Sequence, residues 1–143
     1  MEASSGQRIR EYVVGAFIAL SVVLLASEAF SAFFARMGRQ VESISVDLIG
    51  LFICLHLVGG ILGGYLVGQR RKEDIIRAGA ITALFAYIFE FIYKLLFVGA
   101  FHNSLYSMLG FFFGGVAGAN YARYRRVRMI LHARGRSTDV SAR

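Results

Sequence analysis

Four long apolar segments follow one another along the chain, separated by short polar stretches. They cover residues 12–35, 46–68, 78–101 and 104–122. An α-helix needs about 20 apolar residues to cross the ~30 Å hydrocarbon layer of a bilayer, and each segment has that length or nearly so. The strands of a membrane β-barrel would instead be about ten residues long and would alternate strictly, a pattern absent here. The sequence therefore predicts an all-α, four-transmembrane-helix bundle that forms a single domain over residues 1–143.

The composition agrees with this prediction. Of the 143 residues, 57% are hydrophobic and 17% are charged, whereas soluble domains are about 45–50% apolar and about 25% charged. A small domain buries little of its surface, so in water this chain would expose a large apolar area. The single cysteine, Cys54, cannot form a disulfide within the chain. These figures exclude a soluble enzyme, a disordered segment and a secreted disulfide-rich scaffold.

The positive charges indicate how the helices are oriented. The chain has sixteen Lys and Arg residues. Two precede the first apolar segment, four lie between the second and the third, and seven follow the fourth, which places thirteen on one side of the membrane. Cytoplasmic loops are enriched in these residues. We therefore expect a multi-pass protein of the cell (plasma) membrane with both termini in the cytoplasm.

A basic segment, residues 123–143, follows the last apolar one, and we expect it to continue the fourth helix and end before Gly135. Its first turns carry four arginines, Arg123, Arg125, Arg126 and Arg128. Cations near a membrane surface gain about 1 kcal/mol each from anionic lipid head groups, so we expect these arginines to bind head groups. A basic chain also suits nucleic acid, but attachment to a membrane bundle favours lipid or an acidic protein. We expect no nucleic acid partner.

The second and fourth apolar segments resemble each other. GGILGGYLVGQRR (59–71) aligns with GGVAGANYARYRR (114–126) at an offset of 55 residues. The first and third segments align more weakly at an offset of 64, through Gly15 with Gly79 and Ala19 with Ala83. We interpret this as a tandem duplication of a two-helix hairpin, a parallel repeat about an axis near the membrane normal. The alternative is that glycine-rich helices ending in arginines have become alike independently.

Glycines recur every four residues in both of these segments. They are Gly60, Gly64 and Gly68 in the second segment, and Gly110, Gly114 and Gly118 in the fourth. In lipid, helices associate through close backbone approach across small residues, because there is little hydrophobic drive between them. The spacing predicts the closest helix–helix contacts along these two stripes, either within one chain or between chains.

Four ionisable residues lie well inside the apolar segments. By the helical rise, Glu28, His56, Glu90 and Lys94 are roughly 12, 15, 15 and 9 Å below the outer boundary. An uncompensated charge at the centre of a bilayer costs at least about 2.5–3.5 kcal/mol. We therefore expect these four side chains to face the interior of the bundle and to pair with one another. Glu90 and Lys94, four residues apart, are suited to an ion pair on one helix face.

Two interpretations of this polar group remain open. In one, it handles protons or cations, with Glu28 and Glu90 as carboxylates, His56 as a relay and Lys94 as a modulating charge. In the other it is structural: Lys94 is neutralised by Glu90, alone or together with Glu28, and His56 is hydrogen-bonded between helices. We favour the structural interpretation for Glu90 and Lys94, and neither for Glu28.

Other chemistry finds little support in the sequence. The three histidines, His56, His102 and His132, are spread over different environments, with no Cys/His spacing that suits a metal. A bis-histidine haem would need a second histidine at membrane depth. No nucleophile arrangement or phosphate loop is recognisable. We expect no enzyme activity, metal or cofactor.

The glycine pattern resembles that of small glycine-rich four-helix membrane proteins of prokaryotes whose function is unknown. The matching pieces are Gly59-Gly60 and Gly63-Gly64 ahead of Arg70-Arg71, then Ala78-Gly79-Ala80, and Gly114-Gly115 with Gly118. Glu28 is also similar to the essential carboxylate of small multidrug transporters, but those carry Trp and Pro, and this chain has neither. The first resemblance implies four helices and brings no site residues.

The clearest motifs thus concern packing and orientation. We expect a non-enzymatic structural or accessory subunit that acts through helix–helix packing in a homo-oligomer or a larger membrane complex. The alternative is a small proton- or cation-coupled transporter or channel that uses Glu28, His56 and Glu90.

Overall fold

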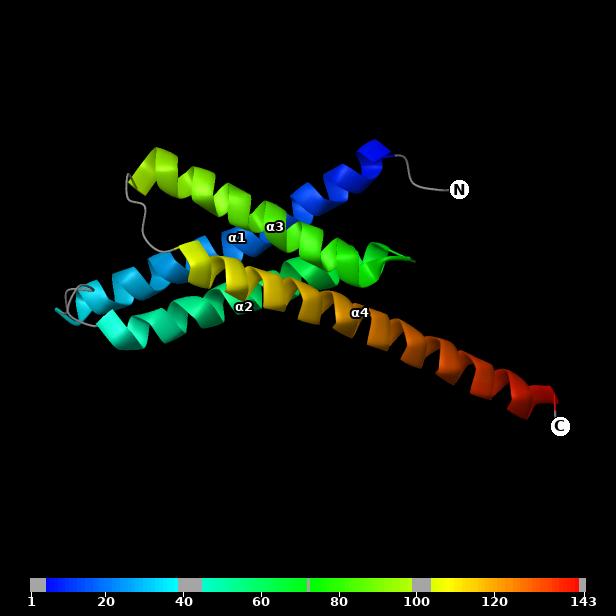
Figure 1. Ribbon diagram of the computed structural model, residues 1–143. Helices are drawn as coiled ribbons and strands as arrows, with labels where there is room; N and C mark the ends of the chain where they lie inside the picture. The colour runs from blue at the N-terminus through cyan, green and yellow to red at the C-terminus, as the bar shows by residue number, and fades with distance from the viewer. Residues whose placement is uncertain (1–4, 39–44, 72, 99–103, 142–143) are drawn as a thin grey trace.

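The computed structural model describes residues 5–38, 45–71, 73–98 and 104–141, and throughout these ranges the regular structure is helical (Figure 1). The helices are α1 (Ser5–Arg36), α2 (Ser45–Arg70), α3 (Ile75–Tyr93) and α4 (Ser104–Ser141), and a π-helical turn, η2 (Lys94–Val98), extends α3. Each of the four predicted apolar segments contributes one helix. The all-helical prediction is therefore confirmed.

The helix ends differ from the predicted boundaries. α1 begins at Ser5 and ends at Arg36, just before Gly38, which adopts a left-handed conformation with φ 66° of the kind that terminates helices. α4 runs without a break through the basic segment to Ser141, so the expectation that this helix ends before Gly135 is wrong. The chain contains no proline, and a single glycine costs a helix only about 1 kcal/mol.

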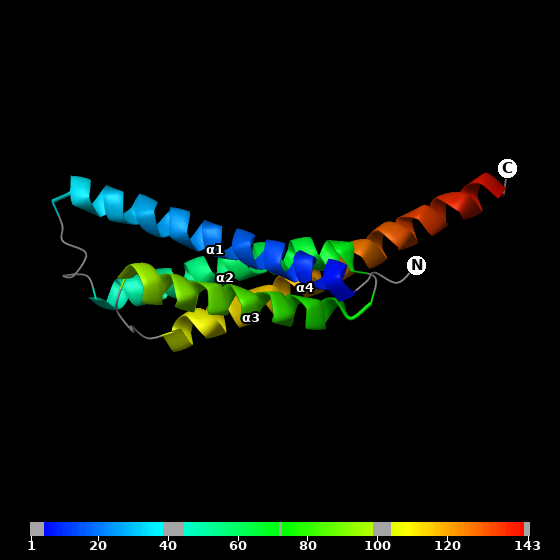
Figure 2. The ribbon, with the colours of Figure 1, turned by 90° about the horizontal axis from the view of Figure 1, so that it is seen from above.

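The helices are arranged as two hairpins joined through α2 and α4. α2 and α4 form the most extensive contact, α1 packs on α2 and α3 packs on α4. Figure 1 shows α2 and α4 running side by side in the same direction, with α4 continuing well beyond the bundle. In Figure 2 the start of α1, the connection between α2 and α3 and the extension of α4 all lie at one end of the molecule.

The two glycine stripes meet at the α2–α4 contact. A methyl group added at Gly60 would lie 2.7 Å from the carbonyl oxygen of Phe111, and one added at Gly64 would overlap the backbone of Gly115. Further along, Gly68 faces Ala119 and Ala122. Since no Cβ fits between these backbones, the two helices can approach this closely only with glycine at these positions.

Small residues also line the contacts inside each hairpin. In the first, an added methyl group at Gly63 would lie 2.6 Å from the carbonyl oxygen of Gly15, and one at Gly59 would lie 2.6 Å from that of Ala19. In the second, one at Gly115 would lie 2.7 Å from the carbonyl oxygen of Gly79. The buried apolar core is made mainly of such small side chains together with Phe111, and comprises Ala16, Ala19, Val23, Ala83, Ala86 and Phe111.

Three of the helices are long and apolar enough to cross a membrane, over Gly6–Arg36, Ile49–Arg70 and Ile75–Phe97. Within the most apolar stretch of each, only 28%, 28% and 39% of the residues are buried inside the chain. The remaining large apolar side chains point outward, as lipid-facing residues do. The fold is therefore that of a membrane protein.

Candidate functional site

A buried carboxylate joins three of the helices. Oε1 of Glu90 in α3 lies 2.9 Å from Nε2 of His56 in α2 and 2.5 Å from Nζ of Lys94 in η2, and it accepts a 3.2 Å hydrogen bond from the Ser107 hydroxyl of α4. We call His56, Glu90, Lys94 and Ser107 the Glu90 cluster. It is the point at which α2, α3 and α4 are connected by polar contacts.

The side chains of the Glu90 cluster differ in how much of their surface is exposed. The side chains of His56 and Glu90 are 4% and 5% exposed, whereas that of Lys94 is 32% exposed. The Phe111 ring packs edge-on against the His56 ring at 4.9 Å between centroids. A carboxylate this buried is costly unless it is paired and hydrogen-bonded, and the three contacts at Oε1 provide that compensation.

The other carboxylate oxygen of Glu90, Oε2, differs from Oε1 in its hydrogen bonding. Oε2 is buried, and no residue in the described part of the chain hydrogen-bonds to it. Buried polar atoms are usually satisfied by protein or by ordered water. All the direct contacts of this carboxylate that the structure provides are therefore made through Oε1.

The second nitrogen of the His56 ring is also engaged. Nδ1 lies 2.6 Å from the carbonyl oxygen of Phe52, one turn earlier in α2. This contact fixes the orientation of the ring, because a histidine bonded at one nitrogen presents the other in a defined direction. Helix α2 thus holds His56 with Nε2 directed at Glu90.

Glu28 does not belong to the cluster. Its side chain is exposed, so the expectation that it faces the bundle interior is wrong. The buried face of α1 ends at Val23, and a residue five positions later lies about 140° around the helix from it. Figure 2 shows the last turns of α1 diverging from the other helices. The structure accordingly brings together three of the four ionisable residues singled out in the sequence.

Ser107 is the member of the cluster that the sequence did not reveal. It lies in the first turns of α4, which starts at the same end of the bundle as η2. A serine three residues inside the fourth apolar segment was a signal of a possible donor. The depth of a hydroxyl alone, however, does not say which neighbouring helix it faces.

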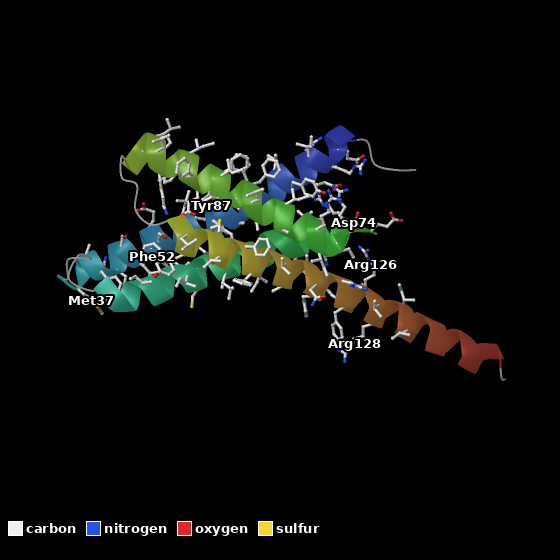
Figure 3. All side chains as sticks on the ribbon, in the orientation of Figure 1. Met37, Phe52, Asp74, Tyr87, Arg126 and Arg128 are labelled. Carbon is white, nitrogen blue, oxygen red and sulfur yellow. The ribbon has the colours of Figure 1, made fainter. Side chains whose placement is uncertain are left out.

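At the opposite end of the bundle, Arg126 binds the end of α2. Its guanidinium donates to the carbonyl oxygens of Gln69, at 2.7 Å, and Gly68, at 3.5 Å, and to that of Arg71. Figure 3 labels Arg126 on α4, near the point where the chain passes from α2 to α3. The last carbonyls of a helix lack intrahelical partners, so Arg126 caps α2. Arg126 therefore has partners within the chain, a role that its expected binding of head groups does not include.

The other basic residues of α4 differ in their contacts. Arg125 donates to the Tyr65 hydroxyl of α2, and this hydrogen bond raises the pKa of the Arg125 guanidinium. Arg128 lies over the ring of Tyr124, with 5.8 Å from its guanidinium carbon to the ring centroid. Arg123 is exposed. Arg125 and Arg128 are exposed as well, so three of the four arginines expected to bind head groups lie at the surface of the chain.

A second ion pair ties α1 to the end of α2. Nε of Arg71 lies 3.0 Å from a carboxylate oxygen of Glu11, and its guanidinium lies over the Tyr12 ring at 4.9 Å. The same guanidinium donates to the carbonyl oxygen of Arg8 at 3.3 Å. Together with Arg126, this pair holds the ends of three helices together, a role that the sequence did not assign to either arginine.

Within the described ranges, no group of three or more His, Cys, Asp and Glu side chains is placed to hold a metal ion. The chemistry available at the Glu90 cluster is instead that of proton donors around one carboxylate. No protein-family model, no curated protein and no solved structure matches this chain.

Proposed function

We propose that the chain is a non-enzymatic structural or accessory subunit of a homo-oligomer or a larger membrane complex. We further propose that the Glu90 cluster holds its helices in register. The observation that carries this proposal is that one buried carboxylate oxygen receives contacts from His56, Lys94 and Ser107, on α2, η2 and α4. Such a group of mutual contacts is typical of a structural joint, because each charge is compensated by its neighbours.

The proposal includes four membrane spans with both termini in the cytoplasm. The first part of α4 is less apolar than the other helices, with Ser107 and Asn120 in it. Its support as a span is its packing, because it lies along the glycine stripe of α2 from Gly110 to Gly118. A helix so closely paired with a spanning helix shares its depth in the bilayer.

We further propose that the two hairpins are a tandem duplication. Support comes from Gly15 and Gly79, which the repeat aligns. Each of them packs against a glycine of the other helix in its hairpin. Gly15 packs against Gly63 of α2, and Gly79 packs against Gly115 of α4. The sequence alignment pairs Gly63 with Gly118 rather than with Gly115, so the contact in the second hairpin is displaced by three residues, about one helical turn. The support is therefore that each hairpin uses one glycine from each of its two helices at its closest contact.

The partners we propose are anionic lipid head groups and a second membrane subunit, in the simplest case another copy of the chain. Arg123, Arg125 and Arg128 are exposed cations of α4 suited to head groups. Glu28 supports a protein partner, because an exposed carboxylate in a membrane helix is costly unless a polar group covers it.

A small proton or cation transporter is the second candidate. The observation that favours it is Oε2 of Glu90, which is buried and which no described residue hydrogen-bonds. A carboxylate oxygen in that state is a place where a proton, a cation or a water molecule could bind.

Flux measurements on the purified protein in proteoliposomes separate the two candidates. We expect no proton or monovalent cation flux above that of empty liposomes at any pH from 5 to 9. Copies carrying two different affinity tags, mixed before reconstitution, should co-purify if the chain assembles with itself. Flux in the unmodified protein that Glu90→Gln or Glu28→Gln abolishes would overturn the structural proposal and support the transporter.

A further inference from the structure

We propose that the Glu90 cluster is a binding site for a proton, which it holds on His56 as an imidazolium. The inference goes beyond the structural role proposed above, and it applies whether or not the chain transports anything. It follows from counting donors and acceptors around the two ring nitrogens.

The first nitrogen must carry a hydrogen. Nδ1 of His56 lies 2.6 Å from the carbonyl oxygen of Phe52. A carbonyl oxygen can only accept a hydrogen bond, so a contact at this distance requires an N–H at Nδ1. If the ring were neutral, Nε2 would then be bare and could only accept.

The second nitrogen must carry one as well, because it faces an acceptor. Nε2 lies 2.9 Å from Oε1 of Glu90. The same oxygen lies 2.5 Å from the ammonium of Lys94, which can only donate, and receives the hydroxyl of Ser107. An oxygen that already accepts from these donors carries no hydrogen of its own, so toward Nε2 it is an acceptor as well. Nε2 therefore donates, and a ring with hydrogens on both nitrogens is an imidazolium.

The charges around His56 are compatible with this state. Glu90 from α3 supplies one negative charge next to the ring, and Lys94 from η2 supplies a second positive charge on the far side of that carboxylate. From α4 the ring meets the Ser107 hydroxyl through Glu90 and the edge-on Phe111 ring. Lys94 is about one-third exposed, so its ammonium can reach toward polar surroundings, as long basic side chains do.

Loss of the proton would break one of the two contacts of the ring. A neutral imidazole has one N–H, so it can donate to Phe52 or to Glu90 but not to both. The bound proton thus maintains the contact of His56 with Phe52 and the contact between α2 and α3 at the same time, and its loss would weaken the joint. The cluster is a joint whose strength depends on pH.

Nitrogen-15 NMR of the histidine side chain tests the assignment directly. The chain has three histidines, so a His102→Gln, His132→Gln double variant in detergent micelles reports His56 alone. At pH 7 we expect both ring nitrogens to carry a hydrogen, and at high pH we expect one of them to lose it. A neutral single-tautomer pattern already present at pH 7 would overturn the proposal.

A Glu90→Gln substitution in the same background shows whether the carboxylate holds the proton. We expect His56 to be neutral at pH 7 in that variant, since no anion faces Nε2. An imidazolium pattern retained there would also overturn the assignment of the site. If this variant does not fold, thermal melts of the otherwise unmodified double variant decide. Its melting temperature should fall between pH 6 and pH 9, and it should fall less with His56→Gln added. Equal changes in both would contradict the proposal.

Discussion

At the scale of single residues, Glu90 and Glu28 differ in what surrounds their carboxylates. Its carboxylate is enclosed and bound by His56, Lys94 and Ser107, whereas the carboxylate of Glu28 is exposed on α1. Removing one partner of a buried charge pair leaves the remaining charges uncompensated, which costs more than the pair itself contributes. The two glutamates are therefore a matched pair for mutation.

We expect Glu90→Gln to lower the free energy of unfolding by about 2–3 kcal/mol, because His56 and Lys94 lose their common anion. Glu28→Gln, the same chemical change at an exposed position, should alter it by no more than about 0.5 kcal/mol. Reversible unfolding in mixed micelles, followed by circular dichroism, measures both. Equal losses in the two variants would show that the enclosure of Glu90 is not what matters.

The residues of the cluster were predictable to the extent that depth and spacing define them. The four-residue interval between Glu90 and Lys94 indicates their pair, and the helical rise places His56 at the depth of Glu90. Neither argument determines the rotation of a helix about its axis. That rotation turns Glu28 outward and brings Ser107 to the carboxylate, and it is set by how the helices pack together.

At the scale of the helices, the α2–α4 contact depends on the absence of side chains. Gly60, Gly64 and Gly68 lie against α4 at separations where a Cβ would meet backbone or Cβ atoms. Gly50, near the start of the same helix, has no atom within 4 Å of the position a Cβ would take. A glycine-to-alanine substitution should therefore lower stability in the second half of α2 but not near its start.

We expect Gly64→Ala to destabilise the protein by about 1–3 kcal/mol, since the added methyl group overlaps the Gly115 backbone. Gly50→Ala should be neutral or stabilise it by up to about 1 kcal/mol, because alanine favours a helix over glycine. Thermal melts of both variants in one detergent give the comparison. A Gly64→Ala variant as stable as the unmodified protein would place the close contact elsewhere.

The cap of α2 by Arg126 gives a second prediction at this scale. Arg126→Gln removes a cation from the carbonyl oxygens of Gly68, Gln69 and Arg71, and we expect a loss of about 1 kcal/mol in stability. Arg123→Gln, on an exposed neighbour, should leave stability unchanged. Chemical unfolding of the two variants checks this, and faster hydrogen exchange at the end of α2 in Arg126→Gln alone would support it. Identical behaviour of the two would contradict the cap.

The sequence predicted the order and position of the helices well, because each apolar segment is long and is separated from the next by a short polar stretch. It did not predict the continuation of α4 to Ser141 or the π-helical turn after Tyr93. Nor did it predict that Arg126 binds the end of α2, since an arginine next to an apolar segment is equally suited to lipid. These features depend on contacts between helices that are far apart in sequence.

At the scale of the whole molecule, the bundle has two different ends. The end that carries Arg71 and Arg126 also holds the start of α1 and the extension of α4. The Glu90 cluster lies toward the other end, where α1 ends and α4 begins. Four spans with both termini in the cytoplasm would place the basic end inside the cell, in agreement with the charge distribution.

Cysteine accessibility tests that arrangement. In a Cys54→Ser background, we expect Met37→Cys at the end of α1 to react with a membrane-impermeant maleimide in intact cells. Ser137→Cys in the extension of α4 should react only after lysis. The reason is that three spans, α2, α3 and the first part of α4, separate Met37 from Ser137, and an odd number of crossings places the two residues on opposite sides. Labelling of Ser137→Cys in intact cells would rule out a fourth span in the proposed orientation.

The central claim is that His56 and Glu90 act together as a joint between α2 and α3. A double-mutant cycle measures their coupling from the free energies of unfolding of the unmodified protein, His56→Gln, Glu90→Gln and the double variant. We expect the double variant to lose about 1–2 kcal/mol less than the sum of the two single losses, because the second substitution has no contact left to break. Losses that add to within about 0.5 kcal/mol, as expected for Glu28→Gln combined with Glu90→Gln, would contradict the account.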